Sequence, residues 1–286
     1  MIFNLDMSMS YTRGMTTSYW IKTATQFLQT KGIVTARLDA IILLEDILQV
    51  NRATLLAEPD MEIKDGAVAA LQNLLTRRST HEPLAYIRGK AEFYGRTFKI
   101  SNAVMVPRPE SEAMIELLKS LVTQPNFPTH PKIADVGSGS GNLGITAALE
   151  LDQSQVTLLE IDDDALEISK LNVVLHATQV LAIESDLLSH AAENFDVLLC
   201  NLPYVPDEYE INLAAAHEPK LALFAGQDGL DLYRRLFDEI ADLNKKPLYI
   251  LTEALPSQHQ TLAKLAGDSS YQLTKTDDFI QLYIHL

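Results

Sequence analysis

Four residues after an apolar run carry the clearest potential for chemistry. Residues 201–204 read Asn-Leu-Pro-Tyr and follow FDVLLC, which predicts a buried strand whose carboxyl end is where α/β enzymes usually place their sites. This loop suits group transfer to a planar nitrogen, a weak nucleophile that needs two acceptors to hold its N–H bonds. The side-chain carbonyl of Asn201 and the backbone carbonyl of Leu202 would be these acceptors, and Tyr204 would stack on the flat group. The alternative is a structural turn in which Asn201 caps, Pro203 bends the chain and Tyr204 packs.

A glycine-rich turn offers a second site. In ADVGSGSGNLGITAAL, Gly137, Gly139 and Gly141 separate a predicted strand from a predicted helix. Glycine permits a tight turn and close approach of a ligand, and the helix amino terminus presents free N–H groups. Such a turn alone is weak evidence, because nucleotide sites and plain turns share it. The ligand-binding residues predicted here are Asp135, Gly137, Ser138, Gly139, Ser140 and Gly141.

The next predicted strand, VTLLEI, carries Glu160 near its end. A carboxylate at this place suits hydrogen bonds to two ribose hydroxyls. The spacing G-x-G-x-G differs from that of dinucleotide binders, and the loop has no basic residue to meet a phosphate. A nucleoside without a pyrophosphate fits better, and S-adenosylmethionine is the obvious candidate. The alternative for Glu160 is a solvated strand end within EIDDD.

The elements that position these residues fall into three parts. Residues 18–90 show apolar spacing typical of helices, and residues 91–106 suit a β-hairpin or linker. Residues 107–286 alternate apolar strand-like runs with helix-length segments, which predicts a doubly wound α/β domain with a parallel sheet. FDVLLC would be the central fourth strand. Its carboxyl end would then face the same crevice as the glycine turn.

Charge is distributed unevenly along the chain. Residues 1–105 carry 12 basic and 10 acidic side chains, whereas residues 106–286 carry 11 and 28, a net charge of −17. An acidic domain repels a phosphate backbone, so free nucleic acid is disfavoured and a partner with a basic surface is favoured. Acidity that serves only solubility is the alternative.

Composition restricts the kinds of site and the cellular location that the sequence allows. The single cysteine, Cys200, excludes an internal disulfide and indicates a reducing compartment. The seven histidines show no metal-ligand spacing, so no metal is predicted. The polar amino terminus lacks a signal-peptide core, and no apolar run reaches the ~18 residues of a membrane span. We expect a cytoplasmic monomer with no membrane partner.

From about residue 20 onward the chain resembles the release-factor glutamine methyltransferases, the PrmC/HemK family. The resemblance rests on ARLDAIILLEDIL, RRSTHEPLAYIRGKAEFYGRTFKIS, VMVPRPESE, IADVGSGSG, FDVLLCNLPYVP and HEPKLALFAGQDGLDLYRRL. The first two belong to the family's helical substrate-recognition domain, which adenine and RNA methyltransferases with a similar tetrapeptide lack. The related ribosomal-protein glutamine methyltransferases share the catalytic core, but HEPKLALFAGQDGL is closer to the release-factor branch.

The resemblance implies a Rossmann-like class I methyltransferase domain. It also implies methyl transfer from S-adenosylmethionine to the side-chain amide nitrogen of glutamine in the Gly-Gly-Gln motif of peptide-chain release factors. Asp186 and Leu187 correspond to the family's acidic–aromatic pair, whose second residue flanks the adenine. The segment VPRPESE would lie near the entrance of the cofactor pocket, although a structural role suits Arg108 and Glu110 equally. Asn201, Leu202, Pro203 and Tyr204 correspond to the family's Asn-Pro-Pro-Tyr and are the predicted catalytic and substrate-binding residues, with Asn201 also beside the cofactor.

This sequence departs from the family pattern at three positions. Glu160 replaces the commoner aspartate, which keeps the chemistry on a longer arm. Leu187 replaces an aromatic residue, a change that would weaken adenine binding by ~1 kcal/mol. Leu202 replaces a proline, but it retains the carbonyl that the acceptor role requires, and Pro203 still favours an extended conformation there. Two other functions stay open: methylation of a nucleic-acid amine, and cofactor binding with impaired turnover.

Overall fold

The computed structural model describes residues 14–191 and 194–286, and these form two compact units. One unit takes the described residues up to Arg88 together with Leu213–His217, and the other takes Gly89–Asn212 and Glu218–Leu286. The boundary therefore falls between Arg88 and Gly89, so the predicted hairpin groups with the α/β unit. Among the described residues, no helix has both the length and the apolar character needed to cross a bilayer.

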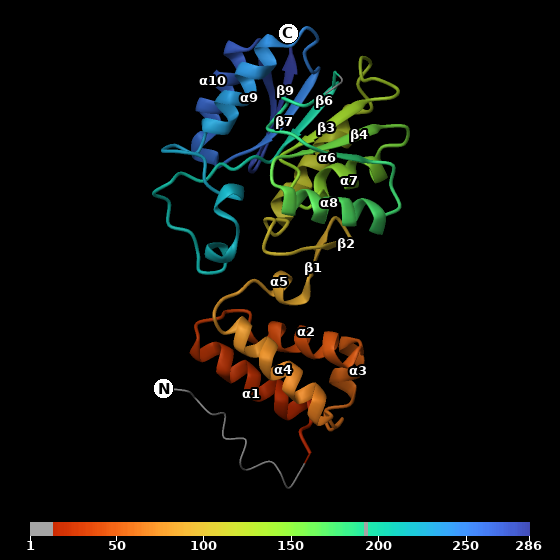
Figure 1. Ribbon diagram of the computed structural model, residues 1–286, viewed down its shortest axis with the longest axis vertical. Helices are drawn as coiled ribbons and strands as arrows, with labels where there is room; N and C mark the ends of the chain where they lie inside the picture. Colours follow the sequence, from red (N-terminus) through yellow and green to blue (C-terminus); the bar gives the residue numbers. More distant parts are fainter. Residues whose placement is uncertain (1–13, 192–193) are drawn as a thin grey trace. The chain divides into compact units, whose positions relative to one another are not determined.

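The first unit is a small helical bundle (Figure 1). Its helices are α1 (Thr17–Thr30), α2 (Ala36–Leu48), α3 (Arg52–Ala57), α4 (Asp65–Arg78) and α5 (Leu84–Arg88). Apart from Thr17, all five helices lie within residues 18–90, the region whose apolar spacing predicts helices. Trp20, Leu28, Leu44 and Leu71 are buried in one core, as their helical spacing requires.

The second unit is built on a seven-stranded sheet with the order β5-β4-β3-β6-β7-β9-β8. The strands are β3 (Lys132–Val136), β4 (Gln155–Glu160), β5 (Leu181–Glu184), β6 (Val197–Cys200), β7 (Tyr249–Glu253), β8 (Tyr271–Asp277) and β9 (Ile280–His285). The strands from β3 to β7 pair in parallel, and β6 lies at the centre between β3 and β7, as predicted.

The prediction of parallel pairing was wrong for the last two strands, which pair antiparallel. Only Asp278 and Phe279 connect β8 to β9, and so short a connection permits a hairpin but no crossover. Strand β8 itself was not predicted. A second, two-stranded antiparallel sheet joins β1 (Lys90–Phe93) to β2 (Arg96–Lys99), in agreement with the expected hairpin.

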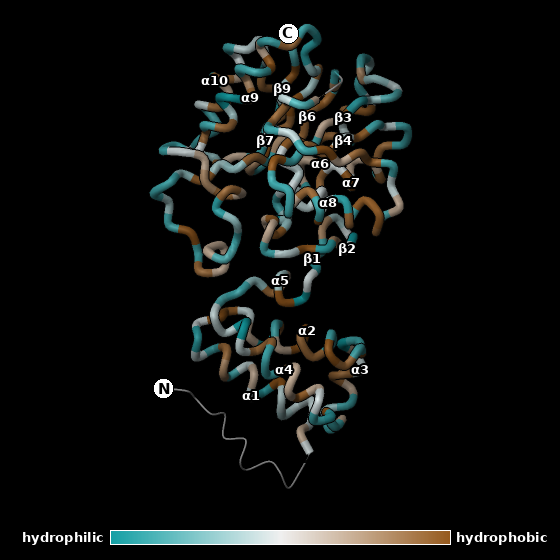
Figure 2. The backbone as a smooth tube through the Cα atoms, viewed as in Figure 1, coloured by the Kyte–Doolittle hydropathy of each residue, from teal (hydrophilic) through white to brown (hydrophobic). Residues whose placement is uncertain are grey.

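Helices cover both faces of the large sheet, so the predicted doubly wound class is confirmed (Figure 1). They are α6 (Glu112–Leu121), α7 (Asn142–Glu150), α8 (Asp163–Leu175), α9 (Asp231–Asp242) and α10 (His259–Asp268). Helices α6, α7 and α8 lie together on one side, and α9 and α10 lie on the other. Hydrophobic residues concentrate on the central strands in Figure 2, because side chains pointing to either face of such a sheet are buried.

Candidate active site

A cavity lies at the carboxyl ends of β3, β4 and β6. Its mouth is open to solvent, and the space inside it, with the mouth included, is about 1050 Å³. The predicted residues that line it are Asp135, Gly137, Ser138, Gly139, Ser140, Glu160, Asp186, Leu187, Asn201, Leu202 and Pro203. Gly141 and Tyr204 do not line it. Parallel strands thus bring residues from four sequence segments to one edge of the sheet.

The glycine turn between β3 and α7 needs glycine at each of its three positions. Gly137, Gly139 and Gly141 have φ of +70°, +53° and +76°, in the left-handed region. A Cβ on Gly139 would meet no atom within 4 Å, so its backbone is open to a ligand. A Cβ on Gly141 would lie 2.9 Å from Leu158 Cδ1, which shows that Gly141 serves helix–sheet packing instead.

Ser138 and Glu160 supply polar atoms at the turn. The Ser138 Oγ is buried and has no hydrogen-bond partner among the described residues. Glu160 is only 7% exposed, and its Oε2 and Oε1 accept the N–H groups of Gly139 at 2.7 Å and Asp162 at 3.0 Å. Burial raises the pKa of Glu160, and these N–H groups oppose the rise. The solvated strand end considered for Glu160 is therefore wrong.

Asp135 lies at the base of the cavity and is 2% exposed. Its Oδ2 accepts the N–H of Gly144 at 2.8 Å, which ties β3 to the first turn of α7. Burial raises the pKa of Asp135 to about 7, and the nearby Glu160 adds to the rise. A Cβ on Gly144 would lie 2.3 Å from Leu158 Cδ2 and 2.9 Å from Asp135 Cβ, so the close approach requires glycine.

The wall beyond β5 is partly apolar and partly charged. Leu187 is buried and adopts a φ of +49°, and the hydroxyl of Ser185 donates to its carbonyl at 2.9 Å. The carboxylate of Asp186 accepts from Arg235 of α9 at 2.7 Å, and Arg235 lines the same cavity. The side chain of Asp186 thus pairs with a cation within the site, and one of its oxygens is already occupied.

The loop after β6 is held by the neighbouring strand. Because Cys200 pairs with Thr252, Asn201 and Glu253 follow side by side at the ends of β6 and β7. Asn201 Nδ2 donates to the Ser111 Oγ at 3.1 Å, and that hydroxyl donates to Glu253 Oε2 at 2.5 Å. Tyr204 Oη donates to Glu253 Oε1 at 3.0 Å. The Oδ1 of Asn201 accepts no hydrogen bond from any described residue, and Asn201 lines the cavity.

Burial governs the ionisation of this group of side chains. Glu253 is 1% exposed, and burial raises its pKa, whereas the hydrogen bonds from Ser111, Tyr204 and Asn201 lower it. Burial and the adjacent Glu253 also raise the pKa of Tyr204 far above its usual value. Tyr204 is therefore a neutral donor to Glu253, and its predicted stacking on an acceptor group stays a prediction.

Leu202 contributes more than its carbonyl. Its side chain is 2% exposed and belongs to the core that includes Tyr233. A Cβ on Gly137 would lie 3.0 Å from Leu202 Cδ2, so Leu202 packs directly against the glycine turn. The Tyr233 hydroxyl lies 2.8 Å from the Cys200 carbonyl and 2.6 Å from that of Glu253, and it is approached by the backbone N–H of Leu202. Leu202 thus joins the two loops of the site through its side chain.

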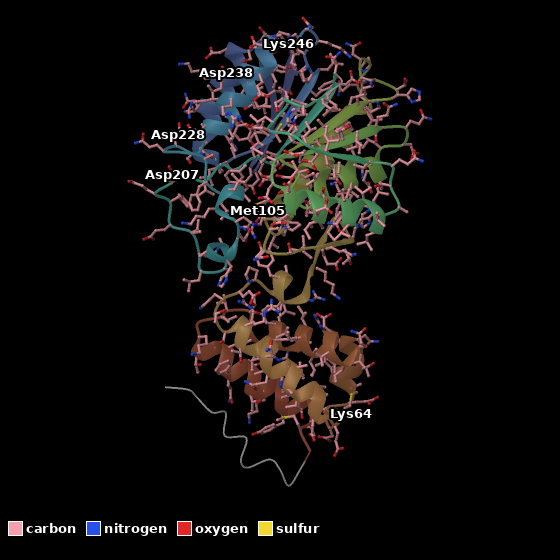
Figure 3. All side chains as sticks on the ribbon, viewed as in Figure 1. Lys64, Met105, Asp207, Asp228, Asp238 and Lys246 are labelled. Carbon is pink, nitrogen blue, oxygen red and sulfur yellow. The ribbon has the colours of Figure 1, made fainter. Side chains whose placement is uncertain are left out.

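The segment VPRPESE is held by an ion pair, and none of its residues lines the cavity. Arg108 Nη2 donates to Glu218 Oε1 at 2.6 Å, and the N–H of Val106 donates to Glu218 Oε2 at 3.2 Å. Met105, labelled in Figure 3, lines the cavity beside this pair. Arg108 therefore has a structural partner in a carboxylate that is 1% exposed.

Comparison with known proteins identifies the family. The PrmC N-terminal domain model matches residues 19–89, and the methyltransferase small domain model matches residues 111–218. The release factor glutamine methyltransferase of Bacillus cereus is 32% identical over 251 residues, covering 86% of this chain and 88% of that protein. That of Koribacter versatilis is 34% identical over 245 residues, covering 84% and 86%. The chain belongs to the release factor glutamine methyltransferase family.

Among solved structures, the catalytic domain of hMettl16 in complex with MAT2A 3′UTR hairpin 1 covers 91% of this chain and 90% of its own. The TM-score is 0.53 at 13% sequence identity. At this identity the similarity shows a shared fold and carries no information about the substrate of this chain.

Several residues of this family member were missed by the sequence analysis. Ser111 lies within the quoted VPRPESE and Glu253 ends the strand-like run KPLYILTE, so position at a strand end was a usable signal for Glu253. Gly144 belongs to the glycine-rich stretch. Arg235 and Glu218 lie in HEPKLALFAGQDGLDLYRRL, but the sequence does not indicate their partners, which lie 49 and 110 residues away.

Proposed function

We propose that this chain transfers a methyl group from S-adenosylmethionine to the side-chain amide nitrogen of glutamine in the Gly-Gly-Gln motif of peptide-chain release factors. Relatives that are over 30% identical across most of their length carry the name release factor glutamine methyltransferase. The observation that carries the proposal is the unpaired Oδ1 of Asn201 in a cavity that also contains the glycine turn and Glu160.

The residues of the cavity fit S-adenosylmethionine. Glu160 would hold the ribose, since its carboxylate accepts backbone N–H groups of Gly139, Asp162 and Ile161 and still has capacity for a further donor. The buried Ser138 Oγ adds an unpaired polar atom, and the space beside the backbone of Gly139 is open to a ligand. The one cation lining the cavity in the described residues is Arg235, which is paired with Asp186, so the site suits a ligand without phosphate. When bound, the cofactor supplies an electrophilic methyl group on a positively charged sulfur.

The chain's own part in the reaction is orientation. A carboxamide nitrogen has a delocalised lone pair, so it reacts only when held in the correct direction. Asn201 Oδ1 and the Leu202 carbonyl would accept its two N–H bonds, and these acceptors gain strength as positive charge develops on the nitrogen. The anchoring of Asn201 by Ser111 keeps the first acceptor in place without any rearrangement during the reaction.

The helical unit would contribute recognition of the protein substrate. Residues 19–89 match the family's amino-terminal domain, and this part of the chain has almost balanced charge. The acidic residues 106–286 would attract a basic partner surface. Asp207 and Asp228, labelled in Figure 3, are examples of the outward-pointing carboxylates of this unit.

Transfer of a radiolabelled methyl group tests the proposal. Purified protein is incubated with S-adenosylmethionine and a release factor, its Gly-Gly-Gln variant with Gln→Ala, or a duplex DNA. The expected result is label on the release factor alone. Label on the Gln→Ala variant at the same rate, or label only on DNA, would refute the proposed substrate. Binding of the cofactor without any transfer would instead indicate a binding protein.

A further inference from the structure

Two buried residues outside the cavity control the amide that the proposed function depends on. Neither Ser111 nor Glu253 lines the cavity, and both are about 1% exposed. We infer that Glu253, acting on Asn201 directly and through Ser111, is a positioning residue that selects which end of the Asn201 amide faces the cavity. This inference rests on the proposed function and adds a residue to it.

The strand register places the three side chains together. Strands β6 and β7 are parallel neighbours, so Asn201 and Glu253, each one residue beyond the paired Cys200 and Thr252, lie adjacent. Ser111 comes from the 3₁₀ turn at Pro109–Ser111 and is inserted against both. Residues 111 and 253 are 142 positions apart in the chain, so only the tertiary fold creates the pair.

Proton counting fixes the direction of each hydrogen bond. An ionised Glu253 can only accept, and it receives hydrogen bonds from Ser111 at 2.5 Å, from Tyr204 at 3.0 Å and from the Asn201 amide. The single hydroxyl proton of Ser111 is used on Glu253, so its oxygen can only accept from Asn201. The amide must therefore turn its Nδ2 toward Ser111, at 3.1 Å, and its Oδ1 toward the cavity.

The opposite orientation of the Asn201 amide would remove one of the two acceptors that hold the substrate amide. With Nδ2 facing the cavity, two donors would meet, because the substrate amide also presents N–H groups there. If the acceptor at position 253 is lost, the Ser111 hydroxyl can donate to Asn201 instead, and it then favours this wrong orientation. One hydrogen bond of ordinary strength changes the population ratio of the two amide orientations by about tenfold.

Variants at position 253 test the inference by single-turnover methyl transfer. Glu253→Met removes both acceptors and is expected to lower the rate constant at least about tenfold. Glu253→Gln retains one oxygen that can accept from Ser111, so an intermediate rate is expected. Adding Ser111→Ala to Glu253→Met should lower the rate no further, because the two residues act in one chain of hydrogen bonds. Glu150→Gln, which alters an ion pair with Arg96 and Lys119, is the control.

Two further measurements separate positioning from a general loss of structure. The dissociation constant for S-adenosylmethionine should change less than about twofold in every variant, since neither residue touches the cavity. The NMR signals of the Asn201 side-chain NH₂, assigned by their absence in Asn201→Ala, should shift in Glu253→Met and not in Glu150→Gln. These signals can be recorded without substrate. If Glu253→Met unfolds, the same measurement is made on Ser111→Ala, which deletes one hydroxyl and is expected to stay folded.

The outcomes are distinct. A wild-type protein that methylates no release factor refutes the proposed function, and the NMR experiment still tests the orientation of Asn201. An active wild-type protein whose Glu253→Met variant retains its rate within about threefold, or whose Asn201 signals are unchanged, refutes the role of Glu253.

Discussion

Replacing Leu202 is expected to separate stability from catalysis. The residue is 2% exposed, packs against Gly137 and lies in the same core as Tyr233. Truncation of a buried leucine costs about 2–5 kcal/mol, because apolar contacts are lost and a cavity remains. The Leu202→Ala variant should therefore lose about this much free energy of unfolding. Its turnover should fall only a few-fold while it is folded, since the carbonyl is unchanged.

Leu202→Pro restores the residue found in the family motif, yet we expect it to destabilise this protein. Proline has one side-chain carbon fewer than leucine and no N–H, and in this structure the N–H of Leu202 approaches the buried Tyr233 hydroxyl. Leaving such a group with fewer partners costs about 1–3 kcal/mol. The surroundings here have adapted to leucine, so the substitution should lower stability without raising turnover.

Urea denaturation and single-turnover methyl transfer at 20 °C, measured on the same preparations, check both expectations. Leu198→Ala, at a buried position of β6, the strand that precedes Leu202, is the matched control for loss of core packing. If folded Leu202→Ala loses more than about 100-fold in rate while Leu198→Ala does not, the side chain itself orients the substrate and our reasoning is wrong. A Leu202→Pro variant as stable as wild type would refute the packing argument.

Three other substitutions test the remaining parts of the site. Asn201→Ala should reduce methyl transfer by at least about 100-fold with little change in cofactor affinity, and near-normal turnover would remove the acceptor role. Glu160→Gln should weaken cofactor binding about tenfold or more by calorimetry, because one charge-assisted acceptor is lost; an unchanged dissociation constant would reject the ribose role. Asp135 has its pKa raised from 3.8 to about 7, so the folded state holds this proton more tightly and the wild type loses stability as pH rises from about 4 to about 7. The loss is at most about 4 kcal/mol, and Asp135→Asn should abolish it in urea denaturation at pH 5 and pH 8; equal pH dependence in both proteins would contradict this assignment.

Local patterns in the sequence were sufficient to predict most of the helices and strands, and the site loops that follow two of the strands. Apolar spacing predicted the long helices and the strands from β3 to β7, since side-chain burial repeats with the period of each structure. The glycine turn and the loop at residues 201–204 were found because they follow strands that must be parallel and adjacent. The antiparallel direction of β9 was missed because an apolar run has no direction, and only the short connection from β8 forces the hairpin.

The sequence alone determined which residues stand at the carboxyl edge of the sheet, because chemistry at strand ends is a local pattern. What each residue does there was decided by partners distant in the chain. Leu202 was predicted to matter only through its carbonyl, but packing against Gly137 makes its side chain part of the core. The orientation of Asn201 depends on Ser111 and Glu253, which meet only when β6 and β7 pair and the 3₁₀ turn packs over them. A hydrogen bond needs its two groups within about 3 Å, and only the tertiary structure brings these residues that close.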